Sequence, residues 1–280
     1  MKLRTIFQDC DIAVQESIVR LYENRPNYFL LFLARGEYFP KGENVNEFTP
    51  YLLDYMPDLY NNHYQRKFIV DYLQRNYSKE GFAYQEEKDI NDLITEMLIY
   101  SHIWEDVGFL KLLVRLAELI DARDYAWSID NIDYHNKLYE VINERIITSL
   151  KNQNLILSKI IETAHCRHIR DAFAHSMYSI DFEKRVIQIW GGRTATNKWS
   201  DTISFDVFQE KFLKTIKTWN QLYYLIDQCR YCAAKDHLDA EIPLPNAKKL
   251  YIYATMKDRG ESQEPGFFGS VYNEDVSTEI

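Results

Sequence analysis

Apolar positions recur at intervals of three and four residues along most of the chain, which is the spacing of amphipathic helices. The pattern predicts helices over 9–24 and 64–77, and Pro26 opens a further short helical run. It is strongest over 84–129, where two apolar stripes follow one another and Gly108 is expected to bend or divide the helix. The chain is therefore predicted to be mainly α-helical.

Further segments complete the predicted helices. A helix is expected over 49–60, because a threonine can cap it and a proline suits its first turn. A helix pair follows at 134–150 and 152–174, and a last long helix, capped by Asp206, extends to Cys232. Together these segments favour a helical bundle whose core lies between the apolar stripes.

Two parts of the chain change from a helical period to strand-like alternation. Segments 185–190 and 201–206 alternate β-branched and polar residues around a glycine pair, which predicts a small β-hairpin. Near the C-terminus, 249–256 and 266–272 predict two short strands in a polar context. The expected fold class is mainly α: a helical bundle with a small β-hairpin after the 152–174 helix and short C-terminal strands.

The length and apolar content set the expected domain organisation. With 280 residues and 46% hydrophobic content, the chain can build one large core or two modest ones. Residues 1–84 are expected to form an N-terminal helical region that packs on the bundle. Residues 85–240 would form the bundle with its β-hairpin, and 241–280 a tail with short strands.

The balance of charge limits the partners that the chain can bind. A net charge of −9 and a pI near 5.4 oppose broad coating by nucleic acid, whose non-specific binding needs lysine and arginine. Any RNA contact is therefore expected to be local. No apolar run approaches the roughly 20 residues of a membrane span, and no signal peptide is recognised, so we expect a cytoplasmic protein without a membrane partner.

The cysteines do not predict a disulfide scaffold or a metal centre. Four cysteines in a chain of this length indicate reduced thiols. Cys229 and Cys232 form a lone CxxC in a predicted helix, and zinc would need two more ligands, for which His237 is the nearby candidate. The preferred interpretation is two small residues one turn apart, with no metal and no cofactor. P-loop, nucleophile-elbow and HExxH motifs are lacking too, which disfavours nucleotide hydrolysis, acyl transfer and zinc proteolysis.

The stretch HCRHIRDAFAHSMYSID, residues 165–181, gathers three histidines, two arginines and two aspartates. Arg170 and His175 are five positions apart. That spacing is about 140° around a straight helix, so the two side chains converge only where the helix ends. Strand-like alternation from Tyr178 onwards places that end near Ala174. We therefore expect the guanidinium and the imidazole to meet in a cleft that is open to solvent.

A second arrangement of these residues also fits the spacing. His168, Asp171 and His175 are separated by three and four positions and would share one helix face. Asp171 can orient a histidine there, whereas a metal would need a better-supported set of ligands. Alternatively, Asp171 accepts hydrogen bonds from Arg167 or His175 at a solvated helix end and has no chemical role.

Arg170, the polar Asp171, three small or apolar residues and His175 resemble the arginine–polar–x3–histidine motif of HEPN domains. The motif lies at the predicted end of a long helix in a mainly helical chain. The stretch HIRDAFAHSMYSID and the hairpin after it are similar to bacterial members, and the resemblance covers residues 85–235. Asp171 stands where these members usually carry asparagine, and it adds negative charge beside a phosphate site.

The resemblance implies a bundle that often dimerises and, in active members, a metal-independent endoribonuclease with paired Arg–His motifs in an interface cleft. His175 would take the proton of a ribose 2′-hydroxyl that attacks the adjacent phosphate, and Arg170 would stabilise the phosphorane. A histidine of the partner chain, or His168, would protonate the leaving 5′-oxygen. Such a protein would bind RNA as a homodimer and, as a toxin or phage-defence protein, would have an antitoxin partner.

Three more residues are candidate substrate contacts. Arg167 adjoins the motif, Tyr178 follows its helix, and Arg193 lies in the glycine-pair turn. Other basic side chains nearby are Lys184, Arg185, Lys198, Lys211, Lys214 and Lys217. Two alternatives stay open: a non-catalytic HEPN-like scaffold that dimerises or binds a nucleotide, which the acidic balance and Asp171 favour, and a helical protein in which the motif arises by chance.

Overall fold

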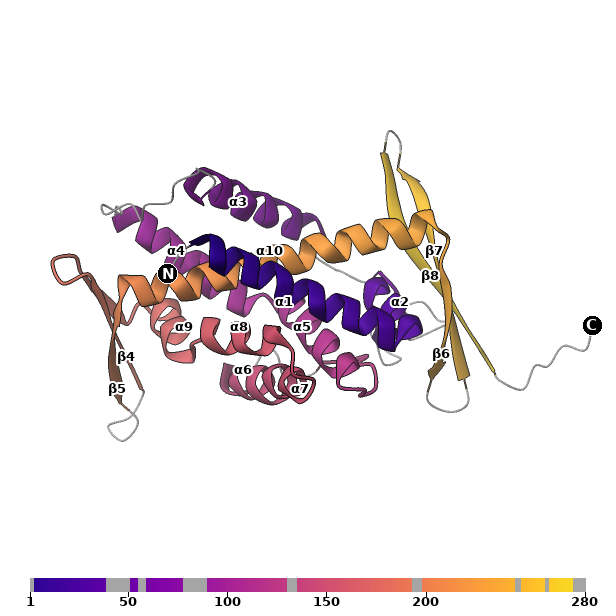
Figure 1. Ribbon diagram of the computed structural model, residues 1–280, viewed down its shortest axis with the longest axis horizontal. Coiled ribbons are helices and arrows are strands. Elements are labelled where there is room, and N and C mark those ends of the chain that lie inside the picture. The colour runs from indigo at the N-terminus through magenta and orange to yellow at the C-terminus, as the bar shows by residue number, and fades with distance from the viewer. Residues whose placement is uncertain are drawn as a thin grey trace, which may run out of the picture.

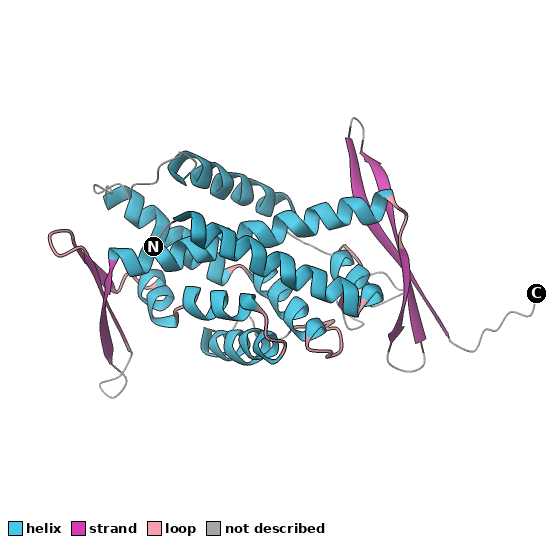
Figure 2. Cartoon of the chain, in the orientation of Figure 1, coloured by secondary structure: helices cyan, strands magenta, loops and turns pink. Residues whose placement is uncertain are grey.

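The computed structural model describes residues 3–38, 51–54, 59–77, 90–129, 135–192, 198–244, 248–259 and 262–273. Helices form an elongated body with a small sheet at each end (Figure 1, Figure 2). The helices are α1 (Leu3–Asn24), α2 (Pro26–Ala34), α3 (Leu59–Tyr77), α4 (Ile90–Glu105), α5 (Val107–Ile120), α6 (His135–Glu140), the π-helix η1 (Val141–Ile147), α7 (Thr148–Asn152), α8 (Ile156–Ala164), α9 (Arg167–Ala174) and α10 (Phe205–Lys235). The strands are β1 (Glu37–Tyr38), β2 (Tyr51–Leu52), β3 (Tyr178–Asp181), β4 (Val186–Gly191), β5 (Trp199–Ser204), β6 (Asp239–Leu244), β7 (Lys248–Arg259) and β8 (Ser262–Asn273).

The longest helix, α10, runs the length of the helical body and connects its two sheets (Figure 1). At 1.5 Å per residue, a helix of this length spans about 46 Å. Its buried positions are spaced by three and four residues: Phe208, Phe212, Ile216, Trp219, Tyr223 and Ile226. Helices α1, α4 and α8 contact it. Among the helices that the structure describes, none is long and apolar enough to cross a membrane.

Several predicted helices are confirmed, with different ends. The helix predicted over 9–24 begins earlier, at Leu3, and the helix predicted over 64–77 begins at Leu59. The segment 134–150 is helical from the start of α6 to the end of α7, with the π-helix η1 between them. Helix α1 contacts α5, α8 and α10, so the N-terminal helix is built into the main core.

The helical stretch predicted over 84–129 divides close to Gly108, as expected, and Asp106 sets the exact break between α4 and α5. Asp106 caps α5 by accepting the backbone N–H of Phe109 at 3.2 Å. Its second carboxylate oxygen accepts the Trp219 indole N–H at 3.2 Å and the Tyr223 hydroxyl at 3.4 Å, both from α10. These contacts fix the break just before the glycine where it was expected.

The helix predicted over 152–174 also divides, at His165 and Cys166, whose backbones are extended. The Tyr100 hydroxyl of α4 reaches into this break. It donates to the Ala164 carbonyl at 3.0 Å and accepts the Cys166 N–H at 3.0 Å. Burial raises the pKa of Tyr100 well above its usual range, so its hydroxyl stays protonated and can donate. The motif therefore lies on the short, separate helix α9 and not at the end of a long one.

The helix predicted over 49–60 is wrong where the structure describes 51–54. Tyr51–Leu52 pair with Glu37–Tyr38 as a short antiparallel ribbon. The Asp54 carboxylate accepts the backbone N–H of Phe267 in β8 at 2.9 Å. This segment is therefore held against the C-terminal sheet by long-range contacts that override its local helical signals.

The sheet after α9 has three antiparallel strands where a hairpin was predicted. The predicted hairpin is β4–β5, and β3 adds to its free edge with Tyr178 opposite Ile189. The inward residues Ile187, Ile189 and Ile203 are buried, and the sheet contacts α9 and α10. The alternation that begins at Tyr178 thus marks a real strand as well as the end of the helix.

The C-terminal sheet is also larger than the two short strands predicted. Strands β6, β7 and β8 are antiparallel in that order, and β7 and β8 have 12 residues each. Leu250, Ile252 and Ala254 alternate on the buried face of β7, which contacts α10. The polar ends of β7 and β8 pair with each other, from Lys257 opposite Glu264 outwards, and extend the strands beyond their apolar centres.

Within the described residues, four helices end in a Schellman turn whose left-handed residue is not glycine. These residues, with their φ angles, are Ala122 (60°), Asn154 (55°), Ser176 (54°) and His237 (53°). In the turn after α5, the Ala122 N–H donates to Leu119 and the Arg123 N–H donates to Glu118. A left-handed residue with a Cβ costs roughly 1–2 kcal/mol, and only asparagine among the four is commonly tolerated.

Replacing Ala122 by glycine should stabilise the protein by about 1 kcal/mol, because glycine has no Cβ to strain this turn. The midpoint of urea unfolding measures the effect. Ala117→Gly, within α5, is the matched control and should lower the midpoint. A lower midpoint for Ala122→Gly as well would contradict the left-handed turn.

Candidate functional site

Helix α9 is fixed at both ends, and its ends define the candidate site. It begins after the break that Tyr100 bridges, and it ends at Ala174, as the spacing predicted. The Ser176 N–H donates to Phe173 and the Met177 N–H to Ala172, which closes the Schellman turn. The buried face of α9 packs against α4 and β4, and these contacts set which side chains of the motif face inward.

The Arg170 guanidinium lies under the surface between two carboxylates. Its Nη2 is 2.5 Å from Oδ1 of Asp171, and its Nη1 is 3.6 Å from Oε1 of Glu105 on α4. The side chain is only 4% exposed, whereas the Glu105 side chain is 40% exposed. The expectation of a solvent-open guanidinium is therefore wrong, because the inward face of α9 carries Arg170 toward α4.

His175 has the opposite environment. It is the C-cap residue of α9, it is exposed, and its backbone N–H donates to the Asp171 carbonyl at 3.1 Å. The next residue, Ser176, turns the chain away in the left-handed conformation. The structure thus places one member of the pair in solvent and the other inside, instead of both in one open cleft.

The Asp171 carboxylate offsets the positive charges of two guanidinium groups. Besides its contact with Arg170, it accepts from Nε of Arg167 at 3.4 Å, one helical turn earlier. The Arg167 guanidinium also lies over the Tyr139 ring, 5.9 Å from its centroid. Of the two roles expected for Asp171, the hydrogen-bonded acceptor is the one present among these contacts. Its negative charge is therefore locally balanced.

The remaining predicted site residues are His168, Tyr178 and Arg193, and the first two of these contact aromatic rings. His168 stacks on the Trp199 ring of β5, with centroids 4.1 Å apart and planes at 13°. A side chain at Gly191 would collide with that ring, so the stack depends on the glycine. Tyr178 packs edge-on against Phe173 at 5.5 Å and contributes to packing. Arg193 lies outside the described residues.

Most of the basic side chains around the motif are paired with acidic or backbone groups. Lys184 contacts Asp181 at 3.1 Å, Lys214 contacts Glu210 at 2.6 Å, Lys217 contacts Asp11 at 2.7 Å and Arg185 lies 3.8 Å from Asp206. Lys211 donates to the Thr163 carbonyl at 2.7 Å. The charges at these positions are therefore already partly balanced before an anion approaches.

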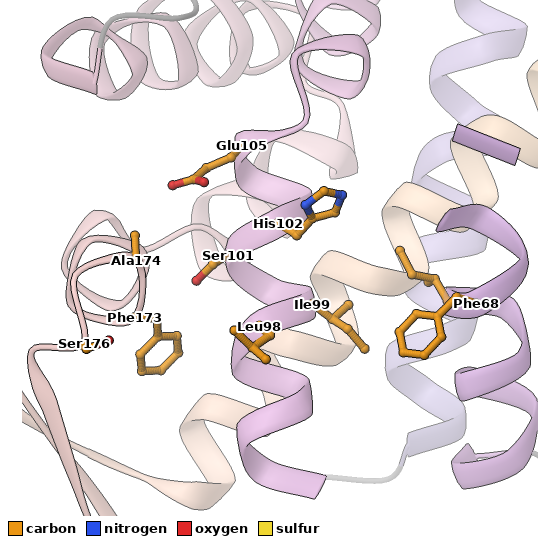
Figure 3. Close-up of a pocket in the computed structure, with 10 residues that line it drawn as sticks. Phe68, Leu98, Ile99, Ser101, His102, Glu105, Phe173, Ala174 and Ser176 are labelled. Atoms are coloured by element: carbon orange, nitrogen blue, oxygen red, sulfur yellow. The ribbon is translucent and has the colours of Figure 1, made fainter. Parts of the chain in front are cut away.

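A groove of about 730 Å³ lies beside the motif helix, between α3, α4 and the end of α9 (Figure 3). Ser101 and Glu105 point to the α9 side of α4, while His102 points away from α9. Sequence reasoning missed this groove because its walls come from three distant segments. The available signal was the exposed stripe Leu98, His102 and Glu105 on α4, at intervals of four and three residues.

The described residues contain no cluster of three or more potential metal ligands. Cys229 is half-buried and Cys232 is exposed on α10, and His237 occupies the turn that ends this helix.

His165, at the break before α9, is the titratable group of this region that sequence reasoning did not single out. Its ring meets the Trp104 ring edge-on at 4.8 Å. Burial, together with the nearby positive charges of Arg170, Lys211 and Arg167, lowers the pKa of His165 to about 3. The ring is therefore neutral in the folded protein at ordinary pH.

This histidine should make the protein sensitive to acid. Between pH 6.5 and about 3, the unfolded chain binds a proton at His165 and the folded chain does not, so stability falls as pH falls. The loss is about 1.4 kcal/mol per pH unit. Urea unfolding at pH 7 and pH 5 measures it, and His165→Gln should reduce the difference by about 2 kcal/mol.

The exposed His175 supplies the matched control for this experiment, because His175→Gln should leave the loss of stability at pH 5 in place. An unchanged pH dependence in His165→Gln would contradict the neutral state of the half-buried His165.

Comparison of the chain with protein-family models, curated proteins and solved structures finds no match. A functional assignment therefore depends on the geometry of α9 and on the groove beside it. Within that geometry, His168 and His175 are exposed, and Arg170 is the buried cation of the motif.

Proposed function

We propose that the chain is a HEPN-like, metal-independent endoribonuclease that cleaves RNA through His175. The observation that carries the proposal is the position of this residue: an exposed imidazole at the end of α9, between two residues that line the groove, Ala174 and Ser176. An imidazole in this position can reach a bound strand and exchange its proton with solvent.

The chemistry needs a base, an acid and a ribose hydroxyl. His175 takes the proton of the 2′-hydroxyl as its oxygen bonds to the adjacent phosphorus. The bond from that phosphorus to the next 5′-oxygen breaks, and this oxygen takes a proton from a second acid. The products are a 2′,3′-cyclic phosphate and a 5′-hydroxyl. DNA lacks the nucleophile and is spared.

The second acid is proposed to come from another copy of the chain. His168 is the alternative within the chain, but its ring is held against Trp199. A homodimer with two α9 ends across one cleft would bring a second imidazole to the leaving oxygen. The proposal also includes, from the resemblance alone, a cytoplasmic toxin or phage-defence role with an antitoxin partner.

Arg170 is proposed to stabilise the phosphate after an exchange of partners. The distance of 3.6 Å between its Nη1 and Glu105 is longer than a hydrogen bond, and Glu105 is partly exposed. A phosphate oxygen can therefore replace Glu105 on the guanidinium, while Asp171 keeps the other side in place at 2.5 Å. Until that exchange, the buried pair holds α9 against α4.

A non-catalytic HEPN-like scaffold is the second candidate, and a specific observation favours it. Arg170 is buried between Asp171 and Glu105, so an incoming phosphate meets two carboxylates around one guanidinium. If these carboxylates keep their places, Arg170 acts only as a structural ion pair. The protein would then dimerise or bind a nucleotide without cutting RNA.

RNA cleavage by the purified protein in EDTA tests the proposal. We expect cleavage of a mixed RNA by the wild type and at least a 100-fold lower rate for His175→Ala, because general-base catalysis contributes about 10²–10⁴. Arg170→Lys should also lose activity, and a thermal melt of each variant checks that it is folded.

The control variant is His237→Ala, at the far end of α10, which should cleave at the wild-type rate. A substrate with 2′-deoxyribose at every position should stay intact. Equal cleavage by wild type and His175→Ala would contradict the enzyme, and no cleavage by a folded wild-type dimer would favour the scaffold.

A further inference from the structure

The groove beside α9 has the size of a small-molecule site. Its volume is about 730 Å³, within the usual range for pockets that bind small ligands. Phe68 of α3 and Leu98 of α4 line one part, and Phe173 and Ser176 at the end of α9 line another (Figure 3). The groove is therefore shared by the motif helix and the helix that holds Arg170 in place.

Ser101 provides the first indication of a ligand. The residue is only 8% exposed, and its Oγ is buried without a hydrogen-bond partner among the described residues. Figure 3 places this hydroxyl on the side of α4 that faces the end of α9, at the wall of the groove. A buried hydroxyl without a partner is unfavourable, so a ligand that bonds to it would be stabilised.

The apolar walls provide the second indication. Leu98 is 64% exposed and Phe68 is 50% exposed, although both are large apolar side chains that line the same groove. The buried Phe173 adds an aromatic ring on the other side of α4. A flat ring on the α9 side of α4, where Ser101 and Glu105 also point, would pack against Phe173.

Glu105 connects the groove with the motif. Its carboxylate lines the groove and lies 3.6 Å from the Arg170 guanidinium. A carboxylate is only an acceptor, so it selects a ligand edge that presents N–H donors. The groove thus combines apolar walls with a hydroxyl and a carboxylate on one side.

We propose that this groove binds one nucleobase of the RNA, a base with an exocyclic amino group, which donates to Glu105 while Ser101 bonds to a neighbouring ring atom. The inference depends on the proposed function for its link to cleavage. Adenine, cytosine and guanine carry such an amino group. Uracil presents carbonyl oxygens on both sides of its one N–H, and these oxygens repel a carboxylate.

Binding of 5′-mononucleotides to the full wild-type chain tests the subsite, since a mononucleotide has no internucleotide bond to cleave. We expect isothermal titration calorimetry with AMP, CMP, GMP and UMP to show that the tightest-binding nucleotide with an amino group binds at least 10-fold more tightly than UMP. Glu105→Gln should remove most of this preference, because an amide also donates.

Two further variants separate binding from folding. Ser101→Ala should lower the affinity for the tightest-binding nucleotide about 5-fold. It should not lower the melting temperature, because the hydroxyl that it removes has no hydrogen-bond partner among the described residues. Leu98→Ser should weaken binding by a similar factor. Ile156→Ser, at another exposed apolar residue (46% exposed, on α8), is the matched control and should leave binding unchanged.

The outcomes distinguish this inference from the proposed function. Equal affinity for all four nucleotides, or no binding at millimolar concentration, overturns the subsite, even if RNA is cleaved through His175. Selective nucleotide binding that depends on Ser101 and Glu105 supports the subsite, even if no RNA is cleaved. A groove that captures only a protein partner would also overturn it.

Discussion

The hydroxyl of Tyr100 determines where the motif helix begins, and the rest of the site depends on that position. It bonds on both sides of the break between α8 and α9, to the Ala164 carbonyl and the Cys166 N–H. The two residues at the break, His165 and Cys166, are extended, so α9 runs in a different direction from α8. The apolar face of α9 packs against α4. Arg170 consequently faces inward and His175 outward. A tyrosine in the core of α4 thus controls which motif group meets solvent.

The local balance of charge is the second constraint on function. Arg167 and Arg170 share Asp171, and Glu105 approaches Arg170 from α4, so the cluster carries equal numbers of positive and negative side chains. An anionic strand is therefore not attracted by a strong field and has to exchange with a carboxylate. In the proposed mechanism, the partly exposed Glu105 is the carboxylate that a phosphate replaces at Arg170, and the same residue lines the groove.

Local patterns predicted the parts of this site that depend on neighbours in the sequence. The spacing of Arg170 and His175 and the alternation from Tyr178 predicted a helix that ends at Ala174. They could not predict that Glu105, far away in the chain, approaches Arg170, or that Asp106 and Tyr100 interrupt two long apolar patterns with side-chain hydrogen bonds. The groove was missed for the same reason, because three separate helices build it.

The proposed cleavage of RNA through His175 is tested most directly by the chemical groups at the ends of the RNA fragments, because each cleavage mechanism leaves different end groups. Mass spectrometry of fragments produced in EDTA should detect a 2′,3′-cyclic phosphate on one side of each cut and a 5′-hydroxyl on the other, as attack by the ribose 2′-hydroxyl requires. Fragments with a 3′-hydroxyl and a 5′-phosphate, or fragmentation that stops when metal is removed, would contradict a mechanism based on the histidine at the end of α9.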